Sequence, residues 1–255
     1  MIPAERLEKI KSELEKSGFI SVGELSKRLG ISLSTVRRDL IDLENDGIIV
    51  RSRGGAGLVG HELSLEATRS TRAEEHTSQK QKIGMKAAEL IENCGCIIID
   101  AGTSTLEVAK YLRPKEPLRV ITDSIEIAYE LKDRENVVVL VTGGIMRPDS
   151  HNLYGGFAEQ MLSSMHAQVC VMGAIGLSLR EGLTKHIIEA LPIRQKMVEI
   201  SHKLICIADS SKFDLTGLVS VCPVERVDVL ITDNGIDPVF KNALEELGVE
   251  VIIAE

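Results

Sequence analysis

The sequence predicts an α/β protein in which a small N-terminal winged helix-turn-helix unit precedes a larger three-layer α/β domain with a mostly parallel sheet. In residues 1–60, short amphipathic segments end at glycines and lead into a β-branched, glycine-rich run. From residue 79 on, continuous apolar runs alternate with amphipathic stretches, as is typical of buried parallel strands joined by helices. A length of 255 residues suits one large core and one smaller core.

Two helices are expected before residue 31. Apolar residues recur at helical spacing near the start of the chain, and this helix is expected to end at Gly18. The segment SVGELSKRLG then opens with a capping box between Ser21 and Glu24 and closes at Gly30. Each segment has one apolar face, so both are expected to pack on a common core.

A third helix and a hairpin complete the small unit. Only the three residues GIS separate the second helix from SLSTVRRDLIDLENDG, so the two form a helix-turn-helix. Four residues form the apolar stripe expected to face the core: Leu33, Val36, Leu40 and Leu43. After Gly47, the run IIVRSRGGAGL suits a small β-hairpin, which would make the unit winged.

The sequence predicts three segments: a DNA-binding unit at 1–57, a polar connection at 58–78 and an α/β domain at 79–255. The strands expected in the last segment are CIIIDA, LRVITD, VVVLVTGG, QVCVMGA, LICIAD, DVLITD and VEVIIA. Their apolar character along the whole run predicts a sheet with helices on both faces.

Composition narrows the classes of function. The formal net charge is -8, yet residues 1–60 carry 10 Lys and Arg against 9 Asp and Glu, so a polyanion is expected to bind only at the N-terminal unit. No run approaches the ~20 apolar residues of a membrane span, and a cytoplasmic location is expected. The five cysteines are expected to be buried thiols, and the six histidines lack ligand spacing, so we expect neither metal nor cofactor.

The third helix carries a charge pattern that favours DNA. Opposite its apolar stripe the helical spacing places Ser34, Arg38, Ile41 and Asn45, with Thr35 and Arg37 at the flanks. The carboxylates of Asp42, Glu44 and Asp46 crowd the second half of the helix, where phosphate would repel them. Such a helix is expected to enter the major groove N-terminus first, with an arginine on guanine and the hydroxyls near phosphate.

The hairpin is expected to add to the DNA contacts of the third helix, and one alternative to DNA binding stays open. Arg51 and Arg53 in the hairpin are expected to touch the DNA backbone or minor groove. The alternative is an exposed helix of a protein-interaction unit, in which Arg37 and Arg38 pair with Asp39 or Asp42.

Small and hydroxylic residues follow several predicted strands. In IIIDAGTSTLEVAKYL, Asp100 and Gly102 lead into a helix that starts near Thr103, Ser104 and Thr105, a combination that suits a phosphate. Asp123 and Ser124 follow the next strand, Gly144 and Arg147 the third, and Lys212 a later one. Taken singly, each turn also fits a capped helix or a tight turn, but their repetition at one sheet edge favours a ligand site.

Motifs along nearly the whole chain resemble the DeoR family of bacterial transcription regulators. These motifs are RLEKI, SLSTVRRDL, GIIVRSRGGA, DAGTST, TDS, GGIMRPDSHNLYG, MGAIGL, EGLT, EALPIRQKM and ADSSKF. The resemblance implies that Ser34, Thr35, Arg37 and Arg38 contact operator DNA and that Asp39 braces the helix. It also implies a C-terminal domain similar in fold to ribose-5-phosphate isomerase that binds a sugar phosphate.

The sequence departs from the family pattern at two positions. Asp123 stands where the family commonly has Asn, and it is expected to accept hydrogen bonds from sugar hydroxyls; the alternative is that the effector is an unusual one. Ile175 stands where a polar residue often follows GA.

A regulator and an enzyme are the two functions to weigh. Isomerisation needs a carboxylate base with supporting acids and a lysine, and the spacings of the available residues do not match such a site. We therefore expect no enzyme, but a repressor of carbohydrate-metabolism genes that a phosphorylated sugar switches. A two-fold operator needs paired reading heads, so a homo-oligomer, a dimer or tetramer, is also expected.

Overall fold

The computed structural model describes residues 3–17, 19–46, 48–52, 55–58, 73, 75–146 and 151–255. The chain divides into two compact units, Met1–Glu75 and His76–Glu255. Most of the predicted connection at 58–78 lies outside the described residues.

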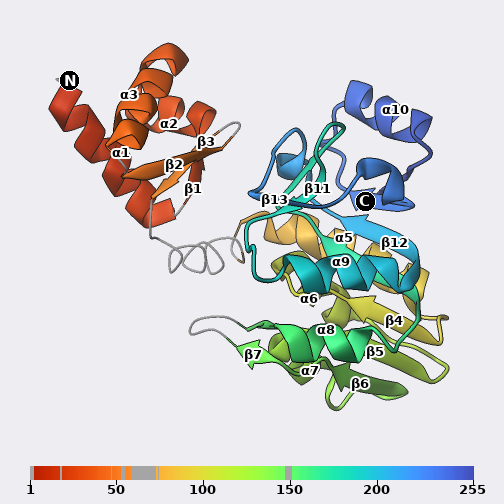
Figure 1. Ribbon diagram of the computed structural model, residues 1–255. Helices are drawn as coiled ribbons and strands as arrows, with labels where there is room; N and C mark the ends of the chain where they lie inside the picture. Colours follow the sequence, from red (N-terminus) through yellow and green to blue (C-terminus); the bar gives the residue numbers. More distant parts are fainter. Residues whose placement is uncertain are drawn as a thin grey trace. The chain divides into compact units, whose positions relative to one another are not determined.

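The N-terminal unit is a winged helix-turn-helix, as predicted (Figure 1). Its helices are α1 (Pro3–Ser17), α2 (Val22–Leu29) and α3 (Leu33–Asn45). Its antiparallel sheet has the order β1-β3-β2, built from β1 (Phe19–Ser21), β2 (Ile49–Ser52) and β3 (Gly55–Leu58). Strand β1 was not predicted, because three residues between two helices carry no strand periodicity.

The core of this unit corrects one predicted position. Val36, Leu40 and Leu43 are buried, but Leu33 is 46% exposed. Asp39 joins the buried side of α3, which centres the core face about 70° of helix rotation away from Leu33. Leu33 is the first residue of the helix, so no preceding turn covers it either.

The second unit is built on a parallel sheet of seven strands with the order β15-β14-β12-β9-β4-β5-β6. All seven strands were predicted. They are β4 (Cys96–Ile99), β5 (Leu118–Thr122), β6 (Val137–Val141), β9 (Ala167–Gly173), β12 (Ser201–Ile207), β14 (Val229–Thr232) and β15 (Glu250–Ile253).

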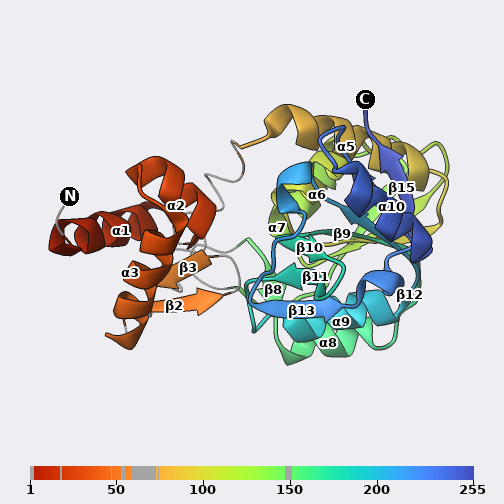
Figure 2. The same cartoon turned by 90° about the horizontal axis from the view of Figure 1, so that it is seen from above.

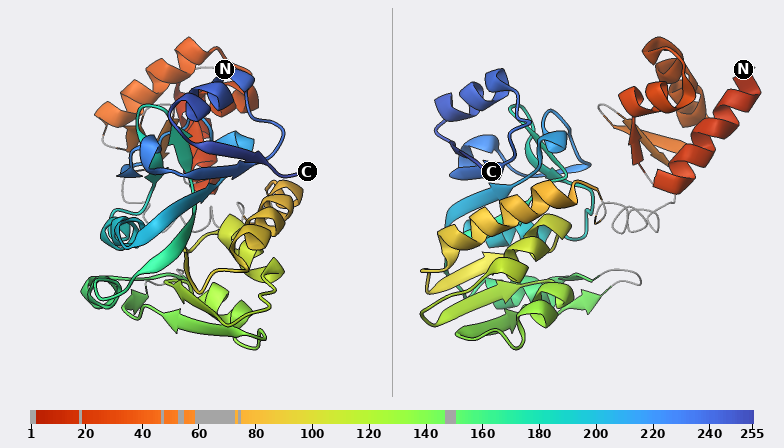
Figure 3. Two further views of the ribbon diagram at one scale, coloured as in Figure 1. Left: turned by 90° about the vertical axis from the view of Figure 1, so that its right-hand side faces the viewer. Right: turned by 180° about the vertical axis from the view of Figure 1, so that it is seen from behind.

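Helices cover both faces of this sheet, which makes three layers (Figure 3). One face packs against α5 (Thr77–Ile91), α6 (Thr103–Tyr111) and α7 (Ile125–Leu131). The other packs against α8 (Gly156–Leu162), α9 (Leu191–Glu199) and α10 (Pro238–Glu246). Among the described residues, every helix is too short or too polar to cross a membrane.

Several short elements of the second unit were not predicted (Figure 2). They are a hairpin of β7 (Ile145–Met146) and β8 (Leu153–Tyr154), a small sheet of β10 (Gly176–Ser178), β11 (Gly182–Lys185) and β13 (Val219–Cys222), and the 3-10 turns η1 (Ser210–Lys212) and η2 (Val224–Arg226). Runs of two to four residues are too short for a periodic sequence signal.

The strand order sets the place of a ligand site. From β4 the chain moves outward to β5 and β6, and from β9 it moves outward the other way to β12, β14 and β15. The adjacent strands β4 and β9 therefore mark the point where the winding reverses. In open parallel sheets, ligands bind beyond the carboxyl ends of the strands at this point.

Candidate nucleic-acid interface and ligand site

A serine just before α3 defines where that helix begins. Ser32 is the N-cap residue, and its hydroxyl accepts a hydrogen bond from the Thr35 amide at 3.2 Å. The Ser34 and Thr35 hydroxyls each lie 2.8 Å from the Ser32 hydroxyl. A cluster of hydroxyl groups thus surrounds the positive end of the helix dipole.

Arg37 and Arg38 are exposed cations on the first half of α3. No ion pair joins either of them to another residue in the described part of the chain. Arg28 on α2, by contrast, pairs with Glu13 and Glu24. The alternative in which Arg37 and Arg38 pair with Asp39 or Asp42 is therefore not the arrangement found.

Asp39 is occupied by a different arginine. It is 2% exposed and receives a hydrogen bond from the Arg6 guanidinium at 2.7 Å, and a second bond joins Nε of Arg6 to its other oxygen. The hydrogen bond to Asp39 raises the pKa of Arg6. This bidentate pair ties α1 to α3 and gives a physical form to the bracing role that the family resemblance implied for Asp39.

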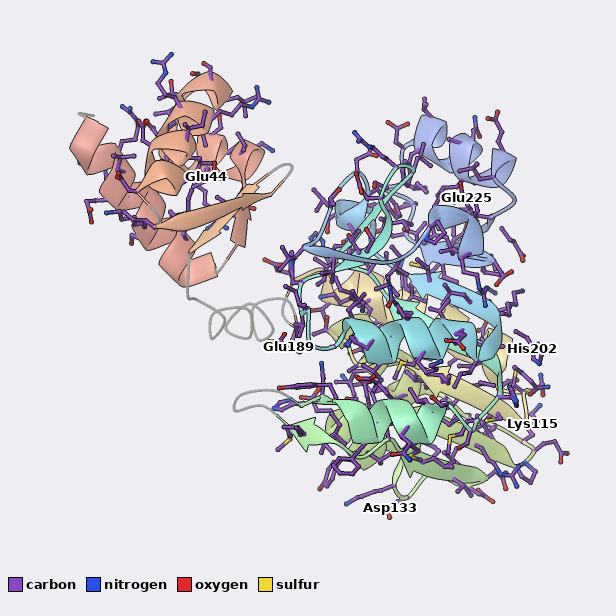
Figure 4. The ribbon with its side chains drawn as sticks, viewed as in Figure 1. Glu44, Lys115, Asp133, Glu189, His202 and Glu225 are labelled. Atoms are coloured by element: carbon purple, nitrogen blue, oxygen red, sulfur yellow. The ribbon has the colours of Figure 1, made fainter. Side chains whose placement is uncertain are left out.

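The second half of α3 is acidic and exposed. Asp42 and Glu44 both face solvent, and Figure 4 labels Glu44 on this helix. Arg51 lies in β2 and Arg53 falls outside the described residues, so their predicted DNA contacts stay predictions.

In the second unit, α6 begins directly beyond β4 at the reversal point. Its N-cap residue is Gly102, which supplies no side-chain cap. Thr103 and Ser104 are half-buried, and their hydroxyls bond to no other described residue. Thr105 is fully buried, and its hydroxyl donates to the Gly102 carbonyl at 3.0 Å. The first amides of α6 therefore have no side chain that caps them, as an anion site requires.

Beside this helix start, Asp100 is fully buried between two cations. Lys185 Nζ on β11 lies 2.6 Å from Asp100 Oδ2, and Arg194 Nε on α9 lies 3.2 Å from Asp100 Oδ1. The two cations thus connect the small sheet and α9 to the end of β4. Burial lowers the pKa of Lys185, although the charge of Asp100 opposes that shift.

Asp123, at the end of β5, shares Arg194 with Asp100. Its Oδ1 accepts the Ala101 amide at 3.0 Å, and its Oδ2 lies 3.8 Å from an Arg194 nitrogen. Burial raises the pKa of Asp123 to about 6, against the opposing charge of Arg194. Burial alone would lower the pKa of Arg194, but the charges of Asp100 and Asp123 raise it overall.

This group of four charges, Asp100, Asp123, Lys185 and Arg194, is called the buried charge cluster below. Three of its polar atoms, Asp100 Oδ1, Asp123 Oδ2 and Arg194 Nε, are buried without a hydrogen bond of good geometry. Buried charges with unmet hydrogen-bonding capacity are costly, and they concentrate at functional sites. Its position at the reversal point of the sheet agrees with such a site.

The remaining predicted ligand residues have local structural partners or lie further out along the sheet. Ser124 caps α7 by accepting the Ile127 amide at 3.3 Å, so its hydroxyl is in use. Gly144 has φ of 116°, and an added Cβ would lie 2.6 Å from the Tyr154 carbonyl oxygen, so the β7–β8 hairpin requires glycine there. Lys212 ends η1 beyond β12 and is half-buried, and Arg147 falls outside the described residues.

Lys185 and Arg194 were missed in the sequence. Arg194 lies within the motif EALPIRQKM and Lys185 directly follows the motif EGLT, but neither residue was predicted to have a role. A signal did exist: carboxylates that end fully apolar strands need cations when they are buried. The sequence could not say which of its 30 Lys and Arg residues supply them.

Two family models match successive parts of the chain. A family model for the DeoR-like helix-turn-helix domain matches residues 6–62, and one for the DeoR C terminal sensor domain matches residues 75–234. The chain is 35% identical to the HTH-type transcriptional regulator GolR of Listeria innocua, over 100% of both chains. It is 32% identical to the HTH-type transcriptional repressor GlcR of Bacillus subtilis, over 100% of this chain and 98% of the relative.

A further relative and a solved structure complete the comparison. The putative aga operon transcriptional repressor of Escherichia coli O157:H7 is 33% identical over 98% of this chain and 93% of its own length. Ribose 5 phosphate isomerase A of Neisseria gonorrhoeae is similar with a TM-score of 0.37 and 20% identity, over 55% of this chain and 54% of that one. Both family models, and the relatives from Listeria innocua, Escherichia coli and Bacillus subtilis, carry the names of transcription regulators and not of enzymes.

Proposed function

We propose that a phosphorylated sugar bound at the start of α6 controls the affinity of this protein for operator DNA. The chain belongs to the DeoR family of transcription regulators and is a DNA-binding transcriptional repressor. The proposed DNA-binding domain comprises residues 1–57, and the proposed effector-binding domain comprises residues 79–255. The genes that the protein represses are proposed to be genes of carbohydrate metabolism.

The DNA contacts are proposed for the N-terminal half of α3. Arg37 and Arg38 are exposed and have no carboxylate partner among the described residues, so phosphate or a guanine edge does not have to displace one. Ser34 and Thr35 lie at the helix start, where amides and hydroxyls suit phosphate oxygens. Arg51 and Arg53 are proposed to add contacts from the wing.

The observation that carries the sensor proposal is the uncapped start of α6 at the reversal point of the sheet. A phosphate placed there meets the amides that follow Gly102 and the hydroxyls of Thr103 and Ser104. Lys212 is proposed to add a cation from the end of β12.

The buried charge cluster is proposed to make the electrostatic potential at this phosphate site more favourable for an anion. Asp100 and Asp123 have no exposed surface, so they are proposed to hold Lys185 and Arg194 in place beside the site. The two cations offset the carboxylates, which would otherwise repel a phosphate at the neighbouring helix start.

For the ligand to control DNA binding, it must favour one arrangement of the two N-terminal units that bind the operator. A homo-oligomer, a dimer or tetramer, is proposed to present two N-terminal units to a two-fold operator. A coupling free energy of about 1 to 3 kcal/mol between the ligand and DNA would be typical.

A thermal unfolding screen of the full chain tests the sensor proposal. Phosphorylated pentoses and hexoses are compared with their unphosphorylated sugars and with inorganic phosphate. A bound ligand at 100 times its dissociation constant adds about 2.7 kcal/mol to the free energy of unfolding of the unit that holds it. Stabilisation by a sugar phosphate, but by neither control, supports the proposal; no stabilisation by any sugar phosphate contradicts it.

A further inference from the structure

Ile41 is an apolar side chain in the middle of a polar helix face. It is 43% exposed and lies on the side of α3 turned away from the buried residues Val36, Leu40 and Leu43. Arg37 and Arg38 are its neighbours one turn closer to the helix start, at the i-4 and i-3 positions.

The core formed by the described residues of the N-terminal unit does not include Ile41. Isoleucine also forms helix less well than alanine, leucine or lysine. A lone exposed apolar residue is ordinary on most surfaces. What distinguishes Ile41 is its place beside two exposed arginines that have no carboxylate partner among the described residues.

We infer that Ile41 reads the 5-methyl group of a thymine in the major groove, beside the base or phosphate that Arg38 contacts. The inference rests on the proposed docking of α3 and adds the base that this helix selects. Isoleucine has no hydrogen-bonding group, and on the major-groove edges of the four bases the apolar feature is the thymine methyl group. Arg38 and Ile41 are three residues apart on the exposed side of the helix, about 4.5 Å along its axis, so both side chains can reach one groove.

Arg37 and Arg38, on the side of Ile41 nearer the helix start, favour DNA over a protein partner, whereas the acidic Glu44 lies at the i+3 position on the other side. An apolar contact with protein would bury Ile41 together with Arg37 and Arg38, neither of which pairs with a described carboxylate, so both charges would lose water without gaining a partner in this unit. A duplex supplies phosphates for the arginines and a methyl group for the isoleucine in one docking geometry.

The test measures the loss of the methyl group on each side of the contact. The full chain selects binding sites from a pool of random double-stranded DNA, and each thymine of the recovered site is replaced in turn by deoxyuridine, which lacks the methyl group but pairs identically. The same duplexes are measured with Ile41→Ala, and with Val239→Ala as a matched control. Val239 is an apolar residue on α10, 76% exposed and outside the N-terminal unit.

The inference predicts that the wild-type chain loses about fourfold in affinity at one thymine of the site, the value of one buried methyl group. Ile41→Ala should bind the thymine and deoxyuridine duplexes equally at that position, while Val239→Ala should keep the wild-type difference. If no thymine is sensitive, or if Ile41→Ala stays as sensitive as the wild type, the inference is overturned while Arg38-dependent binding stands. A chain that selects no duplex at all overturns the proposed docking and this inference together.

Discussion

Arg6 on α1 holds the buried carboxylate of Asp39 on α3 by two hydrogen bonds, across 33 positions of the sequence. The pair lies on the side of α3 that faces the core, whereas Arg38, one position earlier than Asp39, faces solvent. Because Asp39 already has a partner, the neighbouring arginines stay available to a polyanion. One ion pair thus fixes the recognition helix and keeps its exposed face cationic.

The Arg6–Asp39 pair should be strongly non-additive. Arg6→Ala leaves a buried carboxylate without its cation, so in the wild type it should lower the unfolding temperature of the N-terminal unit strongly. In a protein that already carries Asp39→Ala, the same Arg6→Ala change should lower the unfolding temperature less. Thermal unfolding followed by circular dichroism measures both. Lys9→Ala, which breaks a half-exposed pair with Glu5, is the control and should change little. Equal effects of Arg6→Ala in both backgrounds would show that the pair stabilises nothing.

Arg38→Ala should weaken operator binding by about 1 to 3 kcal/mol without unfolding the unit, because the side chain is exposed and makes no ion pair with a described residue. Arg28→Ala is the matched control: its guanidinium is held by Glu13 and Glu24, so its removal should cost less affinity. Fluorescence anisotropy at several salt concentrations measures both affinity and salt dependence. An affinity for Arg38→Ala equal to that of the wild type would exclude this side chain from the interface.

Thr103→Asp should abolish the response to a sugar phosphate and leave DNA binding intact. The carboxylate would occupy the place proposed for the phosphate, while an acidic residue in the first turn of α6 favours the helix. Thr103→Ser keeps the hydroxyl and should keep the response. The measurement is operator affinity with and without the ligand found in the unfolding screen. A response that survives in Thr103→Asp would place the phosphate elsewhere.

Asp123 should make the stability of the second unit depend on pH. Its pKa is about 6 in the folded protein against an ordinary value of 3.8. Between these values the folded state holds a proton that the unfolded state has released, so the contribution of Asp123 to stability is full below pH 3.8 and is lost as pH rises through about 6. Lys185, Arg194 and Asp100 are the charged groups that face it.

Asp123→Asn removes this titration and keeps the side-chain size. From pH 7 to pH 5 the wild type should therefore gain about 1 kcal/mol of unfolding free energy relative to Asp123→Asn. Urea unfolding of both proteins at each pH measures the difference. A difference that does not change with pH would show that Asp123 stays ionised in the folded protein.

The order and type of the secondary-structure elements could be predicted from the sequence, but the pairing of buried charges could not. The strand β4 and the runs from Val169 in β9 and from Leu204 in β12 are apolar and buried, so their parallel, doubly covered sheet followed from composition and spacing. Asp100 and Lys185 lie 85 positions apart, and no periodicity marks two side chains that meet only in the folded chain. Arg194 was hidden for the same reason.

In the recognition helix α3, too, a long-range ion pair changed what the sequence alone predicted. Its exposed face was predicted from the rotation per residue, and Ser34, Arg38 and Ile41 are exposed as expected. The burial of Asp39 shifted the core side and left Leu33 exposed. An ion pair to another helix can thus move a carboxylate into the core against its intrinsic preference for solvent.

Site-specific photo-crosslinking tests most directly whether α3 meets DNA through its cationic end. A photoreactive amino acid is placed at Ser34 in one protein and at Glu44 in another, and each full chain is irradiated on duplexes selected by the wild type. Both positions are exposed and on the same helix, but Glu44 lies in the acidic half. We predict crosslinks to DNA from position 34 and none from position 44. Crosslinks from position 44 with none from position 34 would contradict the proposed docking.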